Sequence, residues 1–343
     1  MSEMTNHQRP GVYSSYEASS LTAAVSGGKA VAVVAAAPED LGGDPCCWTS
    51  YSRALADAGQ CTLTQLAGIA LKNGAGKVWG IPAGEDYNAA IKAAAALDDV
   101  AVVVCDSTEL SIQQALRDMA EECAGLRKER IIVAACAVDE SVEQLVVRAA
   151  ELNSERVVLV APGAAQANGI TCAAAVAGAI AGNTDPALPL GGVELSGIEG
   201  LSAAYEDGDI DLLVKGGVTP LEMMSGKGCV VRAVTTRTTT GGVTDATWRE
   251  LSTILIVDEV IPTIRKALRA KFSRAKNNEQ TRGAIRSQVV LELETCKARE
   301  IIDGYGDVTV NPAETDPAVC VVEFDFAVTH GLNQIWLSAH ITV

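Results

Sequence analysis

The feature that most constrains the fold is a regular alternation, between residues 30 and 161, of short apolar runs with longer segments of helical pattern. The apolar runs are continuous and rich in β-branched residues, which is typical of strands buried on both faces. The expected strands are 30–36, 77–81, 100–105, 130–135 and 156–161, and the expected helices are 62–72, 86–97, 111–123 and 141–152. Short links between them predict an α/β domain with a mostly parallel sheet, helices on both faces and right-handed crossovers.

The pattern changes in the last third of the chain. After an Ala-rich helix expected over 170–181, a glycine-rich stretch over 216–228 marks a boundary, and a strand over 229–236 is expected to follow. Two helices come next, each with one apolar stripe, and Pro262 is expected to kink the first. Their apolar positions are Ile254, Val257, Ile261, Ile264, Leu268 and Phe272, then Ile285, Val289, Leu293 and Cys296. We predict an extended arm over 1–20, an α/β domain over 21–225 and a smaller α+β domain over 226–343.

Charge is unevenly distributed along the chain. Residues 226–343 hold 14 Lys and Arg and 14 Asp and Glu, so the whole net charge of −16 lies in residues 1–225. Such an acidic body disfavours general nucleic-acid binding. One stretch, 265–286, has a single acid, Glu279, and eight basic side chains: Arg265, Lys266, Arg269, Lys271, Arg274, Lys276, Arg282 and Arg286.

Three interpretations of this basic stretch compete. A solvated helix face needs no partner. Nucleic acid is disfavoured because Phe272, the one aromatic residue available for stacking, fits the apolar stripe. An acidic protein surface is the interpretation we favour, and such a contact would weaken with salt.

The residues of common catalytic centres are missing or misplaced. The three histidines are His7, His330 and His340, so the expected α/β domain has no histidine base. There is no nucleophile elbow and no P-loop, and Gly74-Ala-Gly76 precedes a strand where a dinucleotide fingerprint would follow one. We therefore expect no catalytic, cofactor or metal site, and we expect the ten scattered cysteines to be free thiols.

An enzyme or nucleotide-binding protein remains the alternative. Asp106, Asp139 and Asp185 follow expected strands or helices, where the acids of α/β enzymes could sit, although capping and turn roles explain them equally well. The polar residues 1–10 lack an apolar signal region, and the apolar runs are far shorter than the roughly 20 residues of a membrane span. We accordingly expect a chain that folds in a cytoplasm and does not insert into membranes.

The two ends of the chain are predicted to be extended segments. Near the end, Val322, Phe324, Phe326 and Val328 alternate with polar residues, and a second alternation reaches Val343. This last strand could pair with 319–328 of its own domain, or with a neighbouring subunit, because uncovered β edges invite strand addition. The candidate inter-subunit residues are Gly11, Val12, Tyr13, Tyr16, Ile335, Trp336, Leu337, Ile341 and Val343.

Several short motifs stand out along the chain. They are Arg9-Pro-Gly-Val-Tyr13, Ala173-Ala-Ala-Val-Ala-Gly178 with Pro186 and Gly191-Gly192-Val193, Gly217-Val-Thr-Pro220 with Val231-Arg-Ala-Val-Thr-Thr-Arg237, Lys271-Phe272 with Asn277, Thr281-Arg282 and Ile285, and Phe324-Asp-Phe326 with 335–343. Together these motifs resemble one family, the contractile phage tail sheath proteins of Gram-positive prophages and R-type bacteriocins. The resemblance covers nearly the entire chain. It implies a subtilisin-like α/β domain without protease function and a C-terminal domain that lines an inner tube.

The resemblance also implies how such a chain assembles. Sheath subunits form a helical homopolymer around the tail tube protein, between baseplate and tail terminator proteins, in a particle assembled in the bacterial cytoplasm. Matched by position, 11–16 and 335–343 would be arms that join a neighbour's sheet, and 265–286 would face the tube. Larger members carry a β-rich outer domain for which this chain has no room.

Overall fold

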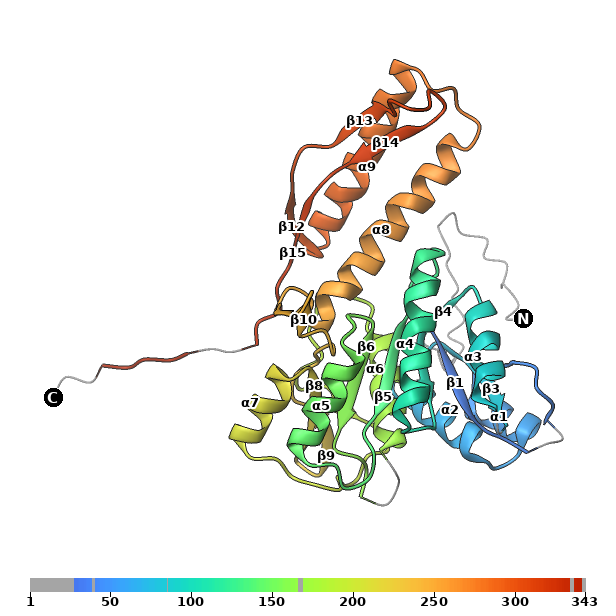
Figure 1. The fold of residues 1–343 in the computed structure, drawn as a ribbon, viewed down its shortest axis with the longest axis vertical. Helices are drawn as coiled ribbons and strands as arrows, with labels where there is room; N and C mark the ends of the chain where they lie inside the picture. Colours follow the sequence, from blue (N-terminus) through green and yellow to red (C-terminus); the bar gives the residue numbers. More distant parts are fainter. Residues whose placement is uncertain (1–27, 39–40, 85, 166–168, 334–335, 341–343) are drawn as a thin grey trace, which may run out of the picture.

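The computed structural model describes residues 28–343 except 39–40, 85, 166–168, 334–335 and 341–343. Figure 1 shows two stacked units, a larger α/β body and a smaller C-terminal unit that rises from it on a long helix. The arm predicted over 1–20 lies outside the described residues.

The body is built on one nine-stranded sheet, whose order within the described residues is β2-β3-β1-β4-β5-β6-β8-β9-β7. From β3 to β8 all neighbours are parallel, whereas β2, β9 and β7 are antiparallel to theirs. The strands are β1 (Ala30–Ala36), β2 (Cys46–Trp48), β3 (Lys77–Ala83), β4 (Val100–Cys105), β5 (Ile131–Ala135), β6 (Val157–Ala161), β7 (Glu194–Leu195), β8 (Val218–Met224) and β9 (Lys227–Val230). The expected mostly parallel sheet is confirmed.

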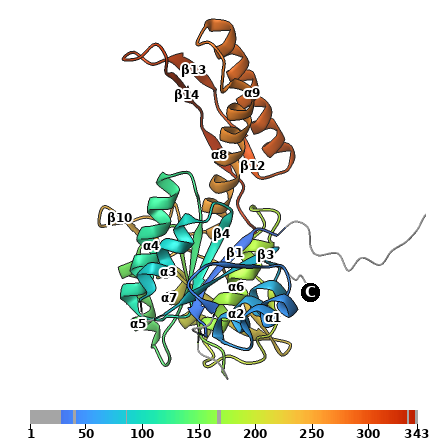
Figure 2. The same ribbon diagram turned by 90° about the vertical axis from the view of Figure 1, so that its right-hand side faces the viewer.

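Helices cover both faces of this sheet (Figures 1 and 2). One face packs against α1, α2 and α6, and the other against α3, α4, α5 and α7. Alternate residues of β1 enter the two cores: Val31 and Val33 face one, and Ala32 and Val34 the other. The helices are α1 (Tyr51–Ala58), α2 (Thr62–Lys72), α3 (Tyr87–Ala96), α4 (Leu110–Gly125), α5 (Val142–Leu152), α6 (Ile170–Gly182) and α7 (Asp207–Lys215).

The Ala-rich helix α6 lies in the middle of its layer and is buried on nearly every side. Small residues allow this, because a side chain at Gly178 would collide with the main chain of Ala70 in α2, and one at Gly182 would meet Gly74. The Ala-Gly motif of the sequence therefore serves helix packing.

Two expectations for the body are corrected. The strand expected over 229–236 is wrong beyond Val230, where β9 ends. Along the residues that follow, buried threonine hydroxyl groups form hydrogen bonds with main-chain carbonyl groups. Thr219 Oγ1 lies 3.0 Å from Val234 O, and Thr236 Oγ1 lies 3.0 Å from Ser154 O. The segment with β2 and α1 was not predicted. In addition, β9 pairs with β8, so the sheet continues past residue 225, the predicted end of the α/β domain.

The C-terminal unit is a pair of helices covered on one side by a twisted two-stranded ribbon (Figure 1). Helix α8 (Leu251–Phe272) and helix α9 (Glu279–Ala298) pack around Val260, Val289 and Leu293. The ribbon pairs β12 (Ile302–Tyr305) with β15 (Phe326–Val328), and β13 (Thr309–Pro312) with β14 (Cys320–Glu323). A small hairpin of β10 (Thr239–Thr240) and β11 (Val243–Thr244) precedes α8.

Helix α8 belongs to both units. Leu251, Ile254 and Leu255 pack in the body, whereas Ile256 and Val260 pack in the C-terminal core. The apolar stripe expected from Ile254 onward is therefore wider than one face, because the helix changes neighbours along its length. The helix continues through Pro262. Among the described residues, no helix is long and apolar enough to cross a membrane.

Candidate assembly surfaces

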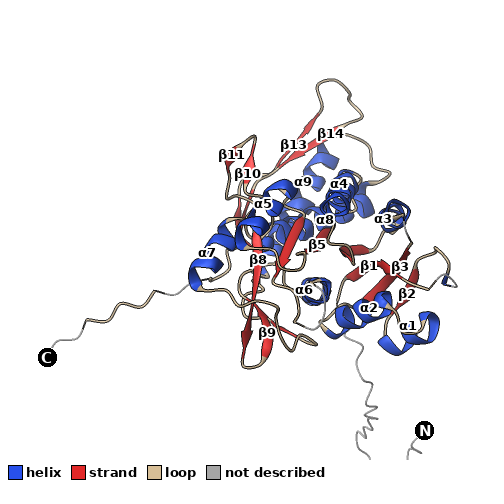
Figure 3. Cartoon of the chain, turned by 60° about the horizontal axis from the view of Figure 1, so that its bottom comes forward, coloured by secondary structure: helices blue, strands red, loops and turns tan. Residues whose placement is uncertain are grey.

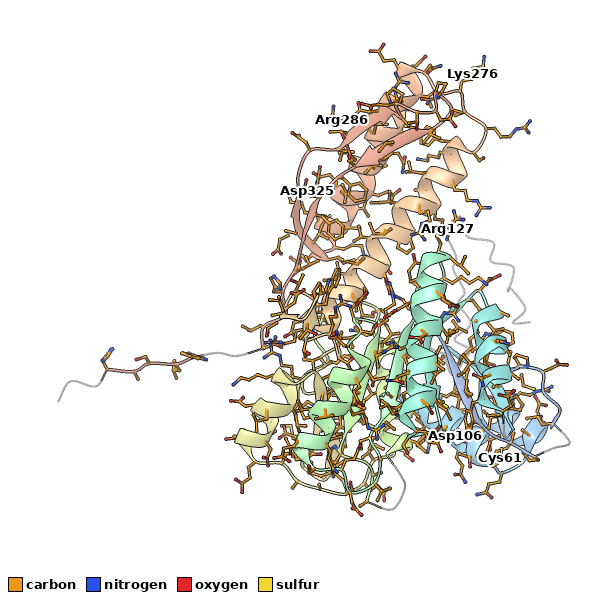
Figure 4. All side chains as sticks on the ribbon, viewed as in Figure 1. Cys61, Asp106, Arg127, Lys276, Arg286 and Asp325 are labelled. Carbon is orange, nitrogen blue, oxygen red and sulfur yellow. The ribbon has the colours of Figure 1, made fainter. Side chains whose placement is uncertain are left out.

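The carboxyl edge of the parallel sheet, where α/β enzymes hold their ligands, carries one of the predicted acids. Both oxygens of Asp106 accept hydrogen bonds, one from the Ala36 N–H at 2.7 Å and one from the Tyr87 hydroxyl at 2.8 Å. Burial and this hydrogen bond raise the pKa of Tyr87. Asp106 therefore ties β1, β4 and α3 together, and it lies on the side of the body remote from the C-terminal unit (Figure 4).

The other side chains that an enzyme could use occupy turns or are buried. Asp185 accepts a hydrogen bond from the Ala187 N–H at 3.0 Å, as in an Asx turn, and Asp139 occupies a turn at φ 60°. Burial raises the pKa of the Cys136 thiol to about 11 and that of Cys172 to about 12, so neither forms a thiolate at neutral pH. Within the described part of the chain, His, Cys, Asp and Glu form no metal-binding group of three.

The opposite, amino edge of the sheet also borders a concavity. A cleft of about 330 Å³ separates α8 from the starts of β1, β4 and β5. Its charged lining mixes both signs, including Lys29, Asp99 and Glu259. The cleft is thus a seam between the two units.

The ribbon of the C-terminal unit has an inner face and two outer edges. Phe324 and Phe326, with ring centroids 6.3 Å apart, turn inward with Val322 and Val328 against the helices, which confirms the alternation expected from the sequence. No third strand joins either edge among the described residues. A two-stranded ribbon with unpaired main-chain groups is a template for further strands.

One of these edges borders a groove. The groove has a volume of about 580 Å³ and lies between β13 and the first half of α9. Arg282 and Arg286, one helical turn apart, line one wall, and Thr309 and Asn311 of β13 line the other. Figure 4 shows Arg286 beside the ribbon.

The predicted C-terminal arm is described over 336–340, and this segment lies away from both units (Figures 1 and 3). The side chains of Trp336 and Leu337 are 90% and 92% exposed. No ribbon or sheet strand is assigned to 336–340, and β14 and β15 pair with β13 and β12 instead. The other predicted arm residues, Gly11, Val12, Tyr13, Tyr16, Ile335, Ile341 and Val343, lie outside the described residues.

The eight predicted basic residues are carried by α8, α9 and the turn between them, and Lys276 lies at the distal end of the C-terminal unit (Figure 4). Six are exposed: Lys266, Arg269, Lys271, Arg274, Lys276 and Arg286. The half-buried Arg282 donates to Asn277 Oδ1 at 3.0 Å, and Lys271 donates to Gln288. Arg265 instead forms an ion pair with Glu129 of the body at 2.8 Å, so it stabilises the junction.

A buried ion pair at this junction was not predicted. Arg156, just before β6, donates two hydrogen bonds to Asp258 of α8, at 2.9 and 3.0 Å. The two side chains are 9% and 10% exposed. Burial opposes the charge of Arg156, but the hydrogen bonds and charge of Asp258 raise the pKa of its guanidinium overall. The partners are 102 residues apart, and no local pattern connects them.

Comparison with known proteins decides the family. The model of the phage tail sheath protein central domain matches residues 80–236, and that of the phage tail sheath C-terminal domain matches residues 243–342. The chain belongs to the phage tail sheath family. It is also 26% identical over 252 residues to the tail sheath protein of Bacillus phage SP01, an alignment that includes 71% of this chain and 43% of that protein's length.

Solved sheath structures share the whole fold. The helical sheath of the anti-feeding prophage in its contracted state matches 98% of this chain and 99% of its own, at 14% identity and a TM-score of 0.72. The sheath tail protein of Desulfitobacterium hafniense matches 93% of this chain and 100% of its own, at 12% identity and a TM-score of 0.69. The two-part architecture is thus the sheath fold.

The contribution of the buried Arg156–Asp258 ion pair to stability can be tested by mutation. Asp258→Ala should lower the free energy of unfolding by about 3–5 kcal/mol, because it leaves a buried guanidinium without its partner. Asp211→Ala is the matched control, since Asp211 forms an exposed pair with Lys215 at 3.9 Å, and it should change stability by less than about 1 kcal/mol. Urea denaturation measures both values. Equal, small effects would show that the buried pair does not hold the units together.

Proposed function

We propose that this chain is the structural subunit of a contractile tail sheath, which polymerises helically around an inner tail tube and shortens to drive the tube through the target cell envelope. The observation that carries the proposal is an apolar C-terminal segment directed away from both units, in a sheath fold whose ribbon has two edges that no described strand covers. The anti-feeding prophage protein is described as a helical sheath in a contracted state, which supports the same behaviour here.

The arms are the proposed connectors between copies. Residues 335–343 of one copy, and 11–16 of another, add as strands to the edges of a neighbour's ribbon, where main-chain hydrogen bonds hold them. Each cross-strand pair contributes only about 0.2–1 kcal/mol. Repetition over many copies makes the lattice strong, and heterologous contacts of this kind generate a helix.

The exposed basic residues of the C-terminal unit form the proposed tube-facing surface. These side chains lie on the second half of α8, on the turn after it and on α9, and Lys276 lies at the distal end of the unit (Figure 4). An acidic tube surface would be attracted to them, with an affinity that falls as salt rises. Arg265 is half-buried and paired with Glu129 at the junction, so it is not available for such a contact.

The remaining assignments follow from this role. The units are an N-terminal arm (1–20), an α/β sheath domain and a C-terminal sheath domain, with the body's sheet continued through β9. The partners are other copies, the tube protein, and the baseplate and tail terminator proteins, in a tail or tail-like particle assembled in the host cytoplasm. The work of contraction comes from the energy of the extended lattice, so the function requires no cofactor.

Arm deletion tests the proposal. Removing 335–343, or 1–18, should leave the body folded, with an unchanged circular dichroism spectrum, but should abolish the hollow tubes or sleeves that the full chain forms in negative-stain micrographs. A matched pair of point variants sharpens the test. Leu337→Asp should prevent assembly and Ser338→Asp should permit it, because neighbouring residues of a strand face opposite sides. Tubes that survive both deletions would exclude strand exchange.

Charge reversal tests the tube-facing surface. Changing Lys266, Arg269 and Arg274 to Glu should weaken co-sedimentation with the tube at low salt by roughly tenfold or more, since each exposed pair contributes about 0.2–1 kcal/mol. The control reverses three exposed lysines of the body, Lys72, Lys92 and Lys215, with the same change in net charge. If both triple variants bind the tube as well as the original chain does, the basic side chains are solvated and do not contact it.

A further inference from the structure

The path by which the C-terminal segment leaves the molecule shows a contact that the sheath role does not by itself explain. After β15, Thr329 remains fastened to the C-terminal unit. Its N–H donates to Ile301 O at 3.3 Å, and its hydroxyl donates to Asp303 at 2.9 Å. Two residues later, Gly331 lies against Pro189 of the body. The chain therefore touches both units before 336–340 projects outward.

The contact at Gly331 leaves no room for a side chain. A Cβ atom there would lie 2.9, 3.0 and 3.1 Å from three carbons of the Pro189 ring. A proline ring cannot rotate away as a flexible side chain can. The close approach thus requires glycine at 331, on grounds of space.

The loop that carries Pro189 is itself held firmly. Asn183 donates from its side chain to Leu188 O at 3.0 Å, and Asp185 accepts from the Ala187 N–H. On either side of Pro189, Ala187 packs in the C-terminal core and Leu190 in the body core. Pro189 is therefore fixed relative to both units.

The next residues continue along the body. Asn333 lines a crevice with Leu190 and Leu251 whose volume is only about 10 Å³, so this contact is close to fully packed. Leu332, between the two contact residues, is 74% exposed and faces outward. Residues 331 and 333 thus make a short contact with the body.

We propose that Gly331 is a positioning residue, whose contact with Pro189 sets the point and direction at which the C-terminal arm leaves the protomer. This inference rests on the proposed sheath function. The contact of residues 331 and 333 with the body restricts the orientations of the arm before it meets a neighbour. Such preorganisation reduces the conformational entropy lost when each arm binds. A methyl group added at residue 331 leaves the arm's own sequence intact but changes the direction in which the arm leaves the body.

The test compares polymerisation of the full chain and its variants by light scattering and electron microscopy. Gly331→Ala should raise the protein concentration needed for polymerisation about tenfold, or about 1.4 kcal/mol per added subunit, because overpacking against a rigid ring shifts the exit. Pro189→Ala/Gly331→Ala should recover most of this loss, since removing the ring makes room for the methyl group. Gly208→Ala is the control, because Gly208 is exposed and a Cβ there meets nothing within 4 Å.

The outcomes separate this inference from the sheath function. Thermal unfolding of the monomeric variants should be unchanged, which distinguishes a misdirected arm from a damaged fold. Polymerisation of Gly331→Ala at the original concentration would overturn the proposal, and so would a double variant as defective as the single one. If the unaltered chain forms no polymer, the sheath function itself fails.

Discussion

The arrangement of the molecule depends on one helix shared by two hydrophobic cores. The first turns of α8 complete the body core through Leu251 and Ile254, and the later turns build the C-terminal core around Val260 and Ile264. The buried Arg156–Asp258 pair fastens this helix to the amino edge of the sheet. Neither end can be reoriented without exposing apolar surface or separating two buried charges, and both are costly. The ribbon and the helices that carry the basic residues are thus held in one geometry relative to the body.

The body sheet and the ribbon of the C-terminal unit differ at their edges. The body sheet ends in strands of three and two residues, β2 and β7, and such short edge strands offer little to a further strand. The ribbon of the C-terminal unit has two edges that no described strand covers, while the apolar arm of the same chain extends elsewhere. Strand addition is therefore favoured at the ribbon and disfavoured at the body. This difference is consistent with the proposed joining of copies at the ribbon.

Much of this could be predicted from the sequence, because the informative signals were local. Helix α2 and strand β4 were predicted at their observed bounds, since continuous β-branched runs and helical spacing identify buried elements. The strand expected over 229–236 failed beyond Val230 because buried threonines that bond to main-chain groups have the same composition as a strand. Arg156, Asp258, Pro189 and Gly331 were missed because their roles arise from contacts between residues more than 100 positions apart. The sequence identifies the basic residues as a group and leads to the hypothesis of a tube-facing surface, whereas the pairing of Arg265 with Glu129 could be found only from the fold.

The central claim is that the C-terminal arm pairs with the ribbon of another copy, and hydrogen–deuterium exchange tests it most directly. Main-chain amides of 337–340 and of the outer edges of β13 and β14 exchange with solvent unless a strand covers them. Comparing the monomer with the assembled polymer, the account predicts that these amides become strongly protected together on assembly, while those of β5 and β6 in the body are protected in both states. Unchanged exchange at the arm and the ribbon in a fully assembled polymer would contradict the account.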